Sequence, residues 1–278
     1  MTEYYYPEEE SWKKRFEVTI PLLLLILILF VLAWKFGWLG SVPIIGELLG
    51  GKTVNVAVIG NDVDLMEIID SDVRKVANVN YMTFTAEDLF NARGMGEDNP
   101  FAKYSLMIIT EGNNGATKTL NRWNYDQINE FASSKPVIII KQAATKVEND
   151  PYANGWKILT FVPVSCASAA GSCDVSVVNW DEASLQTPYA QSHPMLNKLN
   201  WPLEFSSQSG SIEYVDIIPT GTTLVQLERP LASDPTQKAT VPVVVEGSGT
   251  LTKYIYFAFH PRHYKTLLVE AIRYLANV

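Results

Sequence analysis

The sequence predicts an α/β fold: a doubly wound, mostly parallel sheet of the flavodoxin and amidotransferase type, preceded by one transmembrane helix. Three observations support this fold class. The chain has 278 residues, 47% of them hydrophobic, which is enough for a sizeable core. After residue 53, short apolar runs alternate with segments of helical periodicity, as in a parallel sheet covered on both faces. One long uncharged run lies near the amino end.

The uncharged run extends from Val18 to Trp34, and Phe36 lengthens its apolar character. A cleaved signal peptide is disfavoured because no Ala-x-Ala pattern follows it and the run is longer than a usual signal core. A prepilin-type leader would need a glycine at the cleavage point, and a buried core helix would carry polar positions at helical spacing. We therefore expect residues 18–36 to be a retained transmembrane helix in contact with the lipid bilayer.

The charges around this run predict its orientation. Lys13 to Arg15 form a tight cationic cluster before it, whereas only Lys35 and Lys52 follow closely after it. The positive-inside rule then places residues 1–17 in the cytoplasm as a tail. Residues 37–52, rich in glycine, form a juxtamembrane linker, and residues 53–278 form an extracytoplasmic domain of a cell-membrane protein.

The first half of the domain alternates strands and helices. We expect helices at 63–77, shortly after Thr85 and at 125–133, each between apolar runs. Residues 143–192 are richer in Pro, Asn and Ser and are expected to be a loop-rich insertion with strand-like pieces at 158–164 and 175–180. The apolar runs that predict strands in the first half are 54–59, 80–84, 106–109 and 137–140.

The last part of the chain is again regular. Strands are expected at 223–227, 241–245 and 253–259, followed by a helix at about 263–276. Gly247 to Gly249 lie between two strand-like runs, which predicts a hairpin turn.

Two cysteines, Cys166 and Cys173, lie inside the predicted insertion with six residues between them. In an exported domain, a short disulfide loop is the natural pairing, with free core cysteines as the alternative. Their spacing does not match a CxxC metal site.

The stretch from Ile109 to Thr119, "ITEGNNGATKT", is similar in outline to a phosphate-binding loop. A Walker loop needs glycine immediately before its lysine, but Thr117 stands before Lys118. We therefore interpret it as a surface turn with a solvated lysine. The net charge of −8 also argues against nucleic-acid binding, since no basic stripe is present.

Four phrases in a fixed order resemble the class I glutamine amidotransferase-like superfamily, and most closely its ThuA-type (trehalose-utilisation-like) branch. The resemblance covers residues 53–278. The four phrases are Val54 to Gly60, Leu106 to Gly112, His193 to Leu199, and Val243 to Gly249 followed by Tyr254 to Pro261.

The resemblance also identifies what the chain lacks. The superfamily places a cysteine nucleophile at a sharp turn after the strand that corresponds to 136–140, and here that turn is Lys141 to Ala144. The family's His-Pro-Glu phrase matches at His260 and Pro261, but Arg262 replaces the glutamate. The resemblance therefore implies a catalytically degenerate member that is not an enzyme.

Ligands of open α/β sheets bind at the carboxyl ends of the strands, so we expect a crevice there. His193, His260 and a carboxylate could together bind zinc, but we favour the alternative that each histidine makes ordinary local hydrogen bonds. No cofactor or metal is expected. The candidate crevice residues are Glu111, Asn113, Asn114, Lys141, His193, His260 and Arg262.

The expected function is that of a non-enzymatic binding or assembly subunit in a membrane or cell-envelope complex. Its partners would be other membrane or envelope proteins, with a glycan as a possible ligand. The alternative is an envelope glycan-binding or hydrolytic enzyme that uses His193 and His260. The Gly-x-Ser-x-Gly turn of serine hydrolases is not found in the sequence.

Overall fold

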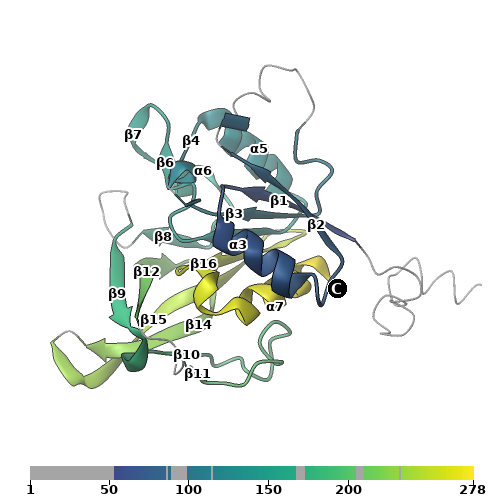
Figure 1. Ribbon diagram of the computed structural model, residues 1–278. Coiled ribbons are helices and arrows are strands. Elements are labelled where there is room, and N and C mark those ends of the chain that lie inside the picture. The colour runs from purple at the N-terminus through teal and green to yellow at the C-terminus, as the bar shows by residue number, and fades with distance from the viewer. Residues whose placement is uncertain are drawn as a thin grey trace, which may run out of the picture. The chain divides into compact units, whose positions relative to one another are not determined.

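The computed structural model describes residues 53–85, 87–88, 99–113, 115–166, 173–204, 210–231 and 233–278 (Figure 1). The predicted tail, transmembrane helix 18–36 and linker 37–52 lie outside the described residues. Within the described residues, no helix is long and apolar enough to cross a membrane.

A nine-stranded sheet forms the centre of the domain (Figure 1). Its first half is parallel, as predicted, because buried apolar strands alternate with covering helices. The order across this half is β2 (Val79–Phe84), β1 (Val54–Ile59), β3 (Leu106–Ile109), β5 (Val137–Ile140) and β16 (Lys253–Phe257).

The second half of the sheet is antiparallel, which corrects the prediction of a mostly parallel sheet. Short connections join β14 to β15 and β15 to β16, and strands joined so closely can only pair antiparallel. The hairpin turn predicted near Gly249 is the second of these connections. The order outward from β16 is β15 (Asp234–Ser248), β14 (Thr222–Leu231), β10 (Ser184–Gln186) and β11 (Leu203–Glu204).

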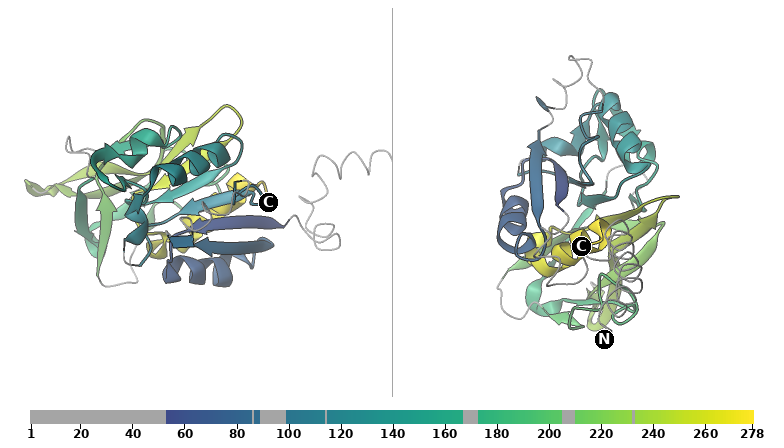
Figure 2. Two further views of the ribbon diagram at one scale, coloured as in Figure 1. Left: turned by 90° about the horizontal axis from the view of Figure 1, so that it is seen from above. Right: turned by 90° about the vertical axis from the view of Figure 1, so that its right-hand side faces the viewer.

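Helices cover both faces of the parallel half (Figure 2). α3 (Val63–Ile68) continues into a π-helical turn, Ile69–Val73. α7 (Lys265–Ala276) packs against this turn, and α5 (Arg122–Ala132) lies on the other face of the sheet. Polar side chains determine where two of them begin: Asp62 accepts from the Leu65 N–H at the start of α3. Asn121 forms a reciprocal capping box with Asn124 at the start of α5.

The predicted strand at 158–164 is wrong. Residues Gly155–Ile158 form the short helix α6, because the side chain of Asn154 caps it at the Trp156 N–H. The Asn129 side chain then fixes the turn that follows, donating to Ile158 O and accepting from the Thr160 N–H. Side-chain bonds from a distant helix therefore override the local apolar pattern.

The remaining short strands form small sheets beside the main one. β4 (Thr119–Leu120), β6 (Lys146–Val147) and β7 (Asp150–Asn154) form one of them. Two antiparallel ribbons pair residues of the predicted insertion with later residues. They are β8 (Val164–Cys166) with β13 (Ile217–Pro219), and the predicted strand β9 (Val175–Asn179) with β12 (Ser211–Val215).

Tyr125 connects α5 to the loops beyond β5. Its ring is fully buried, and its hydroxyl lies 3.0 Å from Ala144 O and 2.8 Å from Lys146 O. A Cβ added at Gly155 would lie 2.1 Å from the same hydroxyl oxygen. The Tyr125 hydroxyl therefore occupies a closely packed polar position in the core.

We predict that Tyr125→Phe destabilises the domain by about 1–3 kcal/mol, because the hydrogen bond that the hydroxyl shares between Ala144 O and Lys146 O is lost. The measurement is the free energy of unfolding in urea. Tyr152→Phe is the matched control, since Tyr152 is 96% exposed and should change stability little. Equal losses in the two variants would contradict the role assigned to Tyr125.

Candidate functional site

A polar pocket of about 470 Å³ opens at the carboxyl ends of β1, β3 and β5. Its walls come from the loops after these strands, from β12 and from the segment after β16. The pocket is lined by Asp62, Asp64, Thr110, Glu111, Gly112, Asn113, Gly115, Lys118, Ile140, Lys141, Glu213, His260 and Arg262.

Lys141 forms a sharp turn directly after β5. It has a left-handed backbone with φ of 54°, which is strained in a residue other than glycine by about 1–2 kcal/mol. Its N–H donates to Phe257 O at 2.8 Å, and the Tyr256 hydroxyl donates to its carbonyl at 3.0 Å. Burial raises the pKa of Tyr256, so the hydroxyl remains a donor. A sharp turn is therefore present at Lys141, directly after β5.

The next residue, Gln142, donates its backbone N–H to a carboxylate of the chain itself. Its acceptor is Glu111 Oε1 at 2.6 Å. The second oxygen of Glu111 lies 3.5 Å from Lys118 Nζ and 3.9 Å from Lys141 Nζ. In hydrolases with a nucleophile elbow, the N–H after the nucleophile contributes to the oxyanion hole. Here that donor is already occupied by Glu111.

The ammonium group of Lys141 pairs with a second carboxylate. Glu213 on β12 accepts from Lys141 Nζ at 2.5 Å. The hydrogen bond from Lys141 holds the pKa of Glu213 below its ordinary value, which keeps Glu213 a carboxylate at neutral pH.

His260 uses both of its ring nitrogens. Nδ1 accepts from the Arg262 N–H at 3.1 Å, so Nε2 carries the proton and donates to Asp62 Oδ2 at 2.9 Å. The carboxylate that the resemblance places at position 262 is thus replaced, in space, by Asp62 from the loop after β1. Neither nitrogen is left to take a proton from a neighbouring nucleophile.

Asp62 is buried, and its two oxygens serve different partners. One accepts from the Leu65 N–H and the other from His260 and the Thr110 hydroxyl. Burial disfavours its charge, but the hydrogen bonds from His260, Thr110 and the Leu65 N–H outweigh this and lower the pKa of Asp62. Arg262 extends away from this pair to Asp64 at 2.8 Å.

His193 lies near the amino end of β16, whereas His260 follows its carboxyl end. This corrects the prediction that the two histidines share the crevice. Its Nε2 is 3.4 Å from Glu246 Oε2, and Glu246 is opposite Ile255 near the start of β16. His260 follows the end of that strand, about 16 Å farther along extended chain. Within the described residues, no group of three or more His, Cys, Asp and Glu side chains is arranged to hold a metal ion.

Glu246 is the centre of a polar cluster around His193. It accepts from the Tyr274 hydroxyl at 2.6 Å and lies 3.2 Å from Lys253 Nζ. Burial disfavours its charge, but His193, Tyr274 and Lys253 together lower the pKa of Glu246 to about 2.

Five of the predicted crevice residues line the pocket: Glu111, Asn113, Lys141, His260 and Arg262. Asn113 also accepts from the Val63 N–H through its side chain. Asn114 lies outside the described residues. Lys118, predicted to be solvated, also lines the pocket and donates to Gln142 Oε1 at 2.9 Å.

Asp62, Asp64 and Glu213 were not among the predicted crevice residues. For Asp62 the sequence does contain a signal, since it follows the apolar run of β1 directly, where an open sheet places its ligands. Glu213 reaches the pocket because β12 pairs with β9 and also bridges to the segment after β16 at Phe259, and the sequence offers no local signal for either contact.

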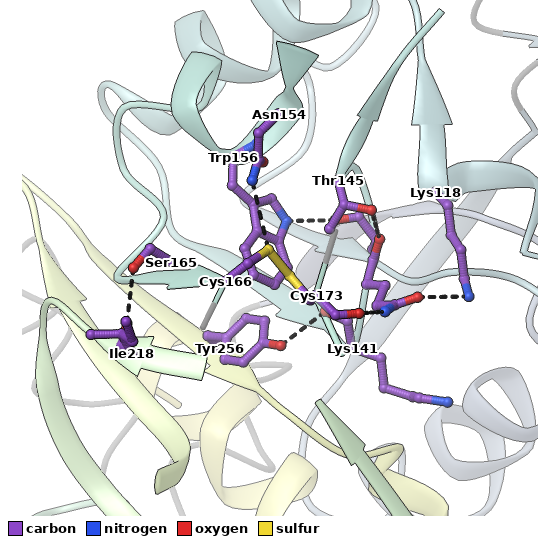
Figure 3. The surroundings of a disulfide bond; sticks show 12 residues. Lys118, Lys141, Thr145, Asn154, Trp156, Ser165, Cys166, Cys173, Ile218 and Tyr256 are labelled. Atoms are coloured by element: carbon purple, nitrogen blue, oxygen red, sulfur yellow. Dashed lines mark hydrogen bonds between the residues drawn. A yellow bond between two sulfur atoms is a disulfide. The ribbon is translucent and has the colours of Figure 1, made fainter. Parts of the chain in front are cut away.

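Cys166 and Cys173 form the predicted disulfide bond (Figure 3). The Cys173 carbonyl accepts from the Gln142 side-chain amide, whose oxygen accepts from Lys118. Closing an eight-residue loop restricts the unfolded chain by about 2.5 kcal/mol in the loop-entropy description. The disulfide thus stabilises the segment that contacts Gln142, and through it the crevice.

No family model and no curated protein matches the chain. Among solved structures, it is similar to a β-galactosidase from Rahnella sp. R3 (11% identity, TM-score 0.48, 80% of this chain and 31% of that one). It is also similar to PurLQS from Thermotoga maritima (8%, 0.44, 81% and 100%). A third is the glutaminase domain of CTPS from Trypanosoma brucei (12%, 0.41, 81% and 94%).

Class I glutamine amidotransferase domains are thus among the structural neighbours of the chain. The chain spans about a third of the length of the β-galactosidases and the carbohydrate deacetylase that it matches. All these TM-scores lie below 0.5, so the function proposed next depends on the chain's own residues.

The pKa of Glu246 leads to a pH prediction. A carboxylate whose pKa is lowered on folding stabilises the protein above its unfolded pKa, near 4.5, and this contribution is lost as the pH falls toward 2. We expect Glu246→Gln to be less stable than the wild type at pH 7, by on the order of 1–3 kcal/mol, and the difference to shrink between pH 4.5 and 2.

Urea unfolding across this pH range is the measurement. Glu148→Gln, at an exposed position, is the control and should show little difference from the wild type. A Glu246→Gln difference that stays constant down to pH 2 would refute the proposed charge network.

Proposed function

We propose that this protein is a catalytically degenerate, amidotransferase-like member of the ThuA-type branch. In this proposal it is a single-pass membrane protein whose extracytoplasmic domain, residues 53–278, acts as a binding or assembly subunit of a membrane or cell-envelope complex. The observation that carries the proposal is the occupied elbow: Lys141 stands at the nucleophile position, and Glu111 occupies the adjacent backbone N–H.

Amidotransferase chemistry needs a nucleophile, a base and a free oxyanion donor. The Lys141 side chain already donates a hydrogen bond to Glu213. His260 bonds through both ring nitrogens, and the Gln142 N–H already donates to a carboxylate. These three contacts support the proposal that amidotransferase chemistry is absent.

The membrane part of the proposal is supported by the sequence alone. The uncharged run from Val18 to Trp34 has nearly the length of a membrane span, and Phe36 extends its apolar character. Lys13 to Arg15 favour a cytoplasmic amino end. A disulfide between Cys166 and Cys173 agrees with an oxidising compartment outside the cytoplasm.

A glycan-binding role is the second candidate, and the polar pocket favours it over glycan hydrolysis. The hydrolytic alternative requires His193 beside His260, and the two histidines lie near opposite ends of β16. Binding requires only the pocket itself.

The non-enzymatic proposal predicts that the purified protein releases no ammonia from glutamine. Wild type and Lys141→Ala should give the same background rate in a coupled glutamate dehydrogenase assay, because neither provides a nucleophile at the elbow. Ammonia release by the wild type that Lys141→Ala abolishes would overturn the proposal.

The assembly proposal predicts that the full-length protein, extracted from its native membrane in mild detergent, purifies with other membrane or envelope subunits. Mass spectrometry of the purified material identifies them, and an unrelated single-pass protein from the same membrane is the control. Recovery as a lone monomer would contradict an assembly role. In intact cells, external protease should cleave the domain, and full protection would contradict the proposed orientation.

A further inference from the structure

We propose that the elbow is a carboxylate receptor for a small acidic sugar of the uronic acid type, and that Glu111 occupies this receptor in cis. The inference depends on the proposed function, because it takes the crevice as a binding site and not as a catalytic one. Its basis is that one backbone N–H and two lysine side chains surround one carboxylate in the lining of the pocket.

These three groups come from two loops: the Gln142 N–H and Lys141 belong to the turn after β5, and Lys118 follows β3. The Gln142 N–H donates to Glu111 Oε1 at 2.6 Å. Lys118 Nζ and Lys141 Nζ are ion-pair partners of Glu111 Oε2, at 3.5 Å and 3.9 Å. A hydrogen bond to a carboxylate is about twice as strong as one between neutral groups, and two nearby lysines add attraction for an anion.

The receptor is preorganised independently of Glu111. The left-handed turn that aims the Gln142 N–H is fixed by bonds from Lys141 N–H to Phe257 O and from the Tyr256 hydroxyl to Lys141 O. The Gln142 side chain is separately bonded to the Cys173 carbonyl and to Lys118. Removing the Glu111 carboxylate should therefore leave these donors in place.

The position is also reachable from solvent. The Glu111 side chain is 14% exposed and lines the pocket of about 470 Å³, which lies within the roughly 300–1,000 Å³ typical of small-molecule sites. An external carboxylate that enters the pocket would meet the same three donors, provided that Glu111 swings aside or is removed.

The lining of the pocket determines the class of ligand. Among the described residues that line the pocket, Ile140 is the one with an apolar side chain and none is aromatic. Such a pocket does not favour an aliphatic or aromatic acid. Three other lining residues can instead bind the hydroxyl groups of a ligand: Asp64 and Glu213 with carboxylate oxygens, and Asn113 with its amide. A hydroxylated acid of monosaccharide size therefore fits best.

The test follows the backbone amide of Gln142 by ¹⁵N NMR in full-length protein in detergent micelles. The probes are D-glucuronate and acetate, with D-glucose and acetamide as neutral counterparts. Glu111→Gln removes the cis carboxylate. Glu213→Gln is the matched control, because it removes a carboxylate from Lys141 without freeing the Gln142 N–H.

In Glu111→Gln, glucuronate should shift the Gln142 amide downfield and saturate, with an affinity at least about tenfold higher than in wild type or Glu213→Gln. Acetate should bind the same position more weakly, and glucose and acetamide should leave the amide unmoved. A folded Glu111→Gln whose Gln142 amide does not respond to glucuronate overturns the inference. So does an equal gain in Glu213→Gln, or equal affinity for glucose.

Should Glu111→Gln fail to fold, Glu111→Ala refolded with and without glucuronate provides the second test. A rise in its melting temperature with glucuronate, but not with glucose, supports the inference, and no rise overturns it. The ammonia assay remains a separate result: glutamine hydrolysis would refute the proposed function, whereas failed carboxylate binding would refute only the receptor.

Discussion

The turn at Lys141 is the constraint on which the crevice depends. β5 and β16 pair in parallel, and the hydroxyl of Tyr256 on β16 reaches past the end of β5 to the Lys141 carbonyl. Trp156 packs edge-on against the Tyr256 ring at 5.3 Å and donates its indole N–H to Ala143 O at 2.8 Å. The turn is thus held from two sides, and the Gln142 N–H and the Lys141 side chain take their positions from it.

The parallel half of the fold is predictable because its determinants are local. Four consecutive apolar residues in β3 and in β5 bury both faces of the sheet, and Asp62 and Asn121 cap the helices from inside their own segments. The antiparallel half depends on which distant segments pair. β10 joins β14 from within a loop-rich region, a contact set by tertiary structure and invisible to local periodicity. The same reason explains the helix at Gly155–Ile158, which Asn129 helps to fix from α5.

The site was predictable where a side chain follows a strand and hidden where one residue has two functions. Glu111 and Lys141 follow β3 and β5 directly, so the rule for open sheets locates them. Asp62 has the sequence position of a helix cap, and it is one; its second oxygen bonds His260, which only the folded chain brings near. His193 was misplaced because a short phrase gives no information about which end of the sheet it occupies. A backbone donor such as the Gln142 N–H has no sequence signature at all.

The turn at Lys141 and the Glu111 carboxylate that contacts it have different structural causes. The left-handed turn is imposed by bonds to β16 that do not involve the Lys141 side chain, so its presence says nothing about whether position 141 performs chemistry. Glu111 and Gln142 follow the paired strands β3 and β5, so the sheet brings the Glu111 side chain near the Gln142 N–H. The carboxylate then covers a backbone donor that an incoming anion would use.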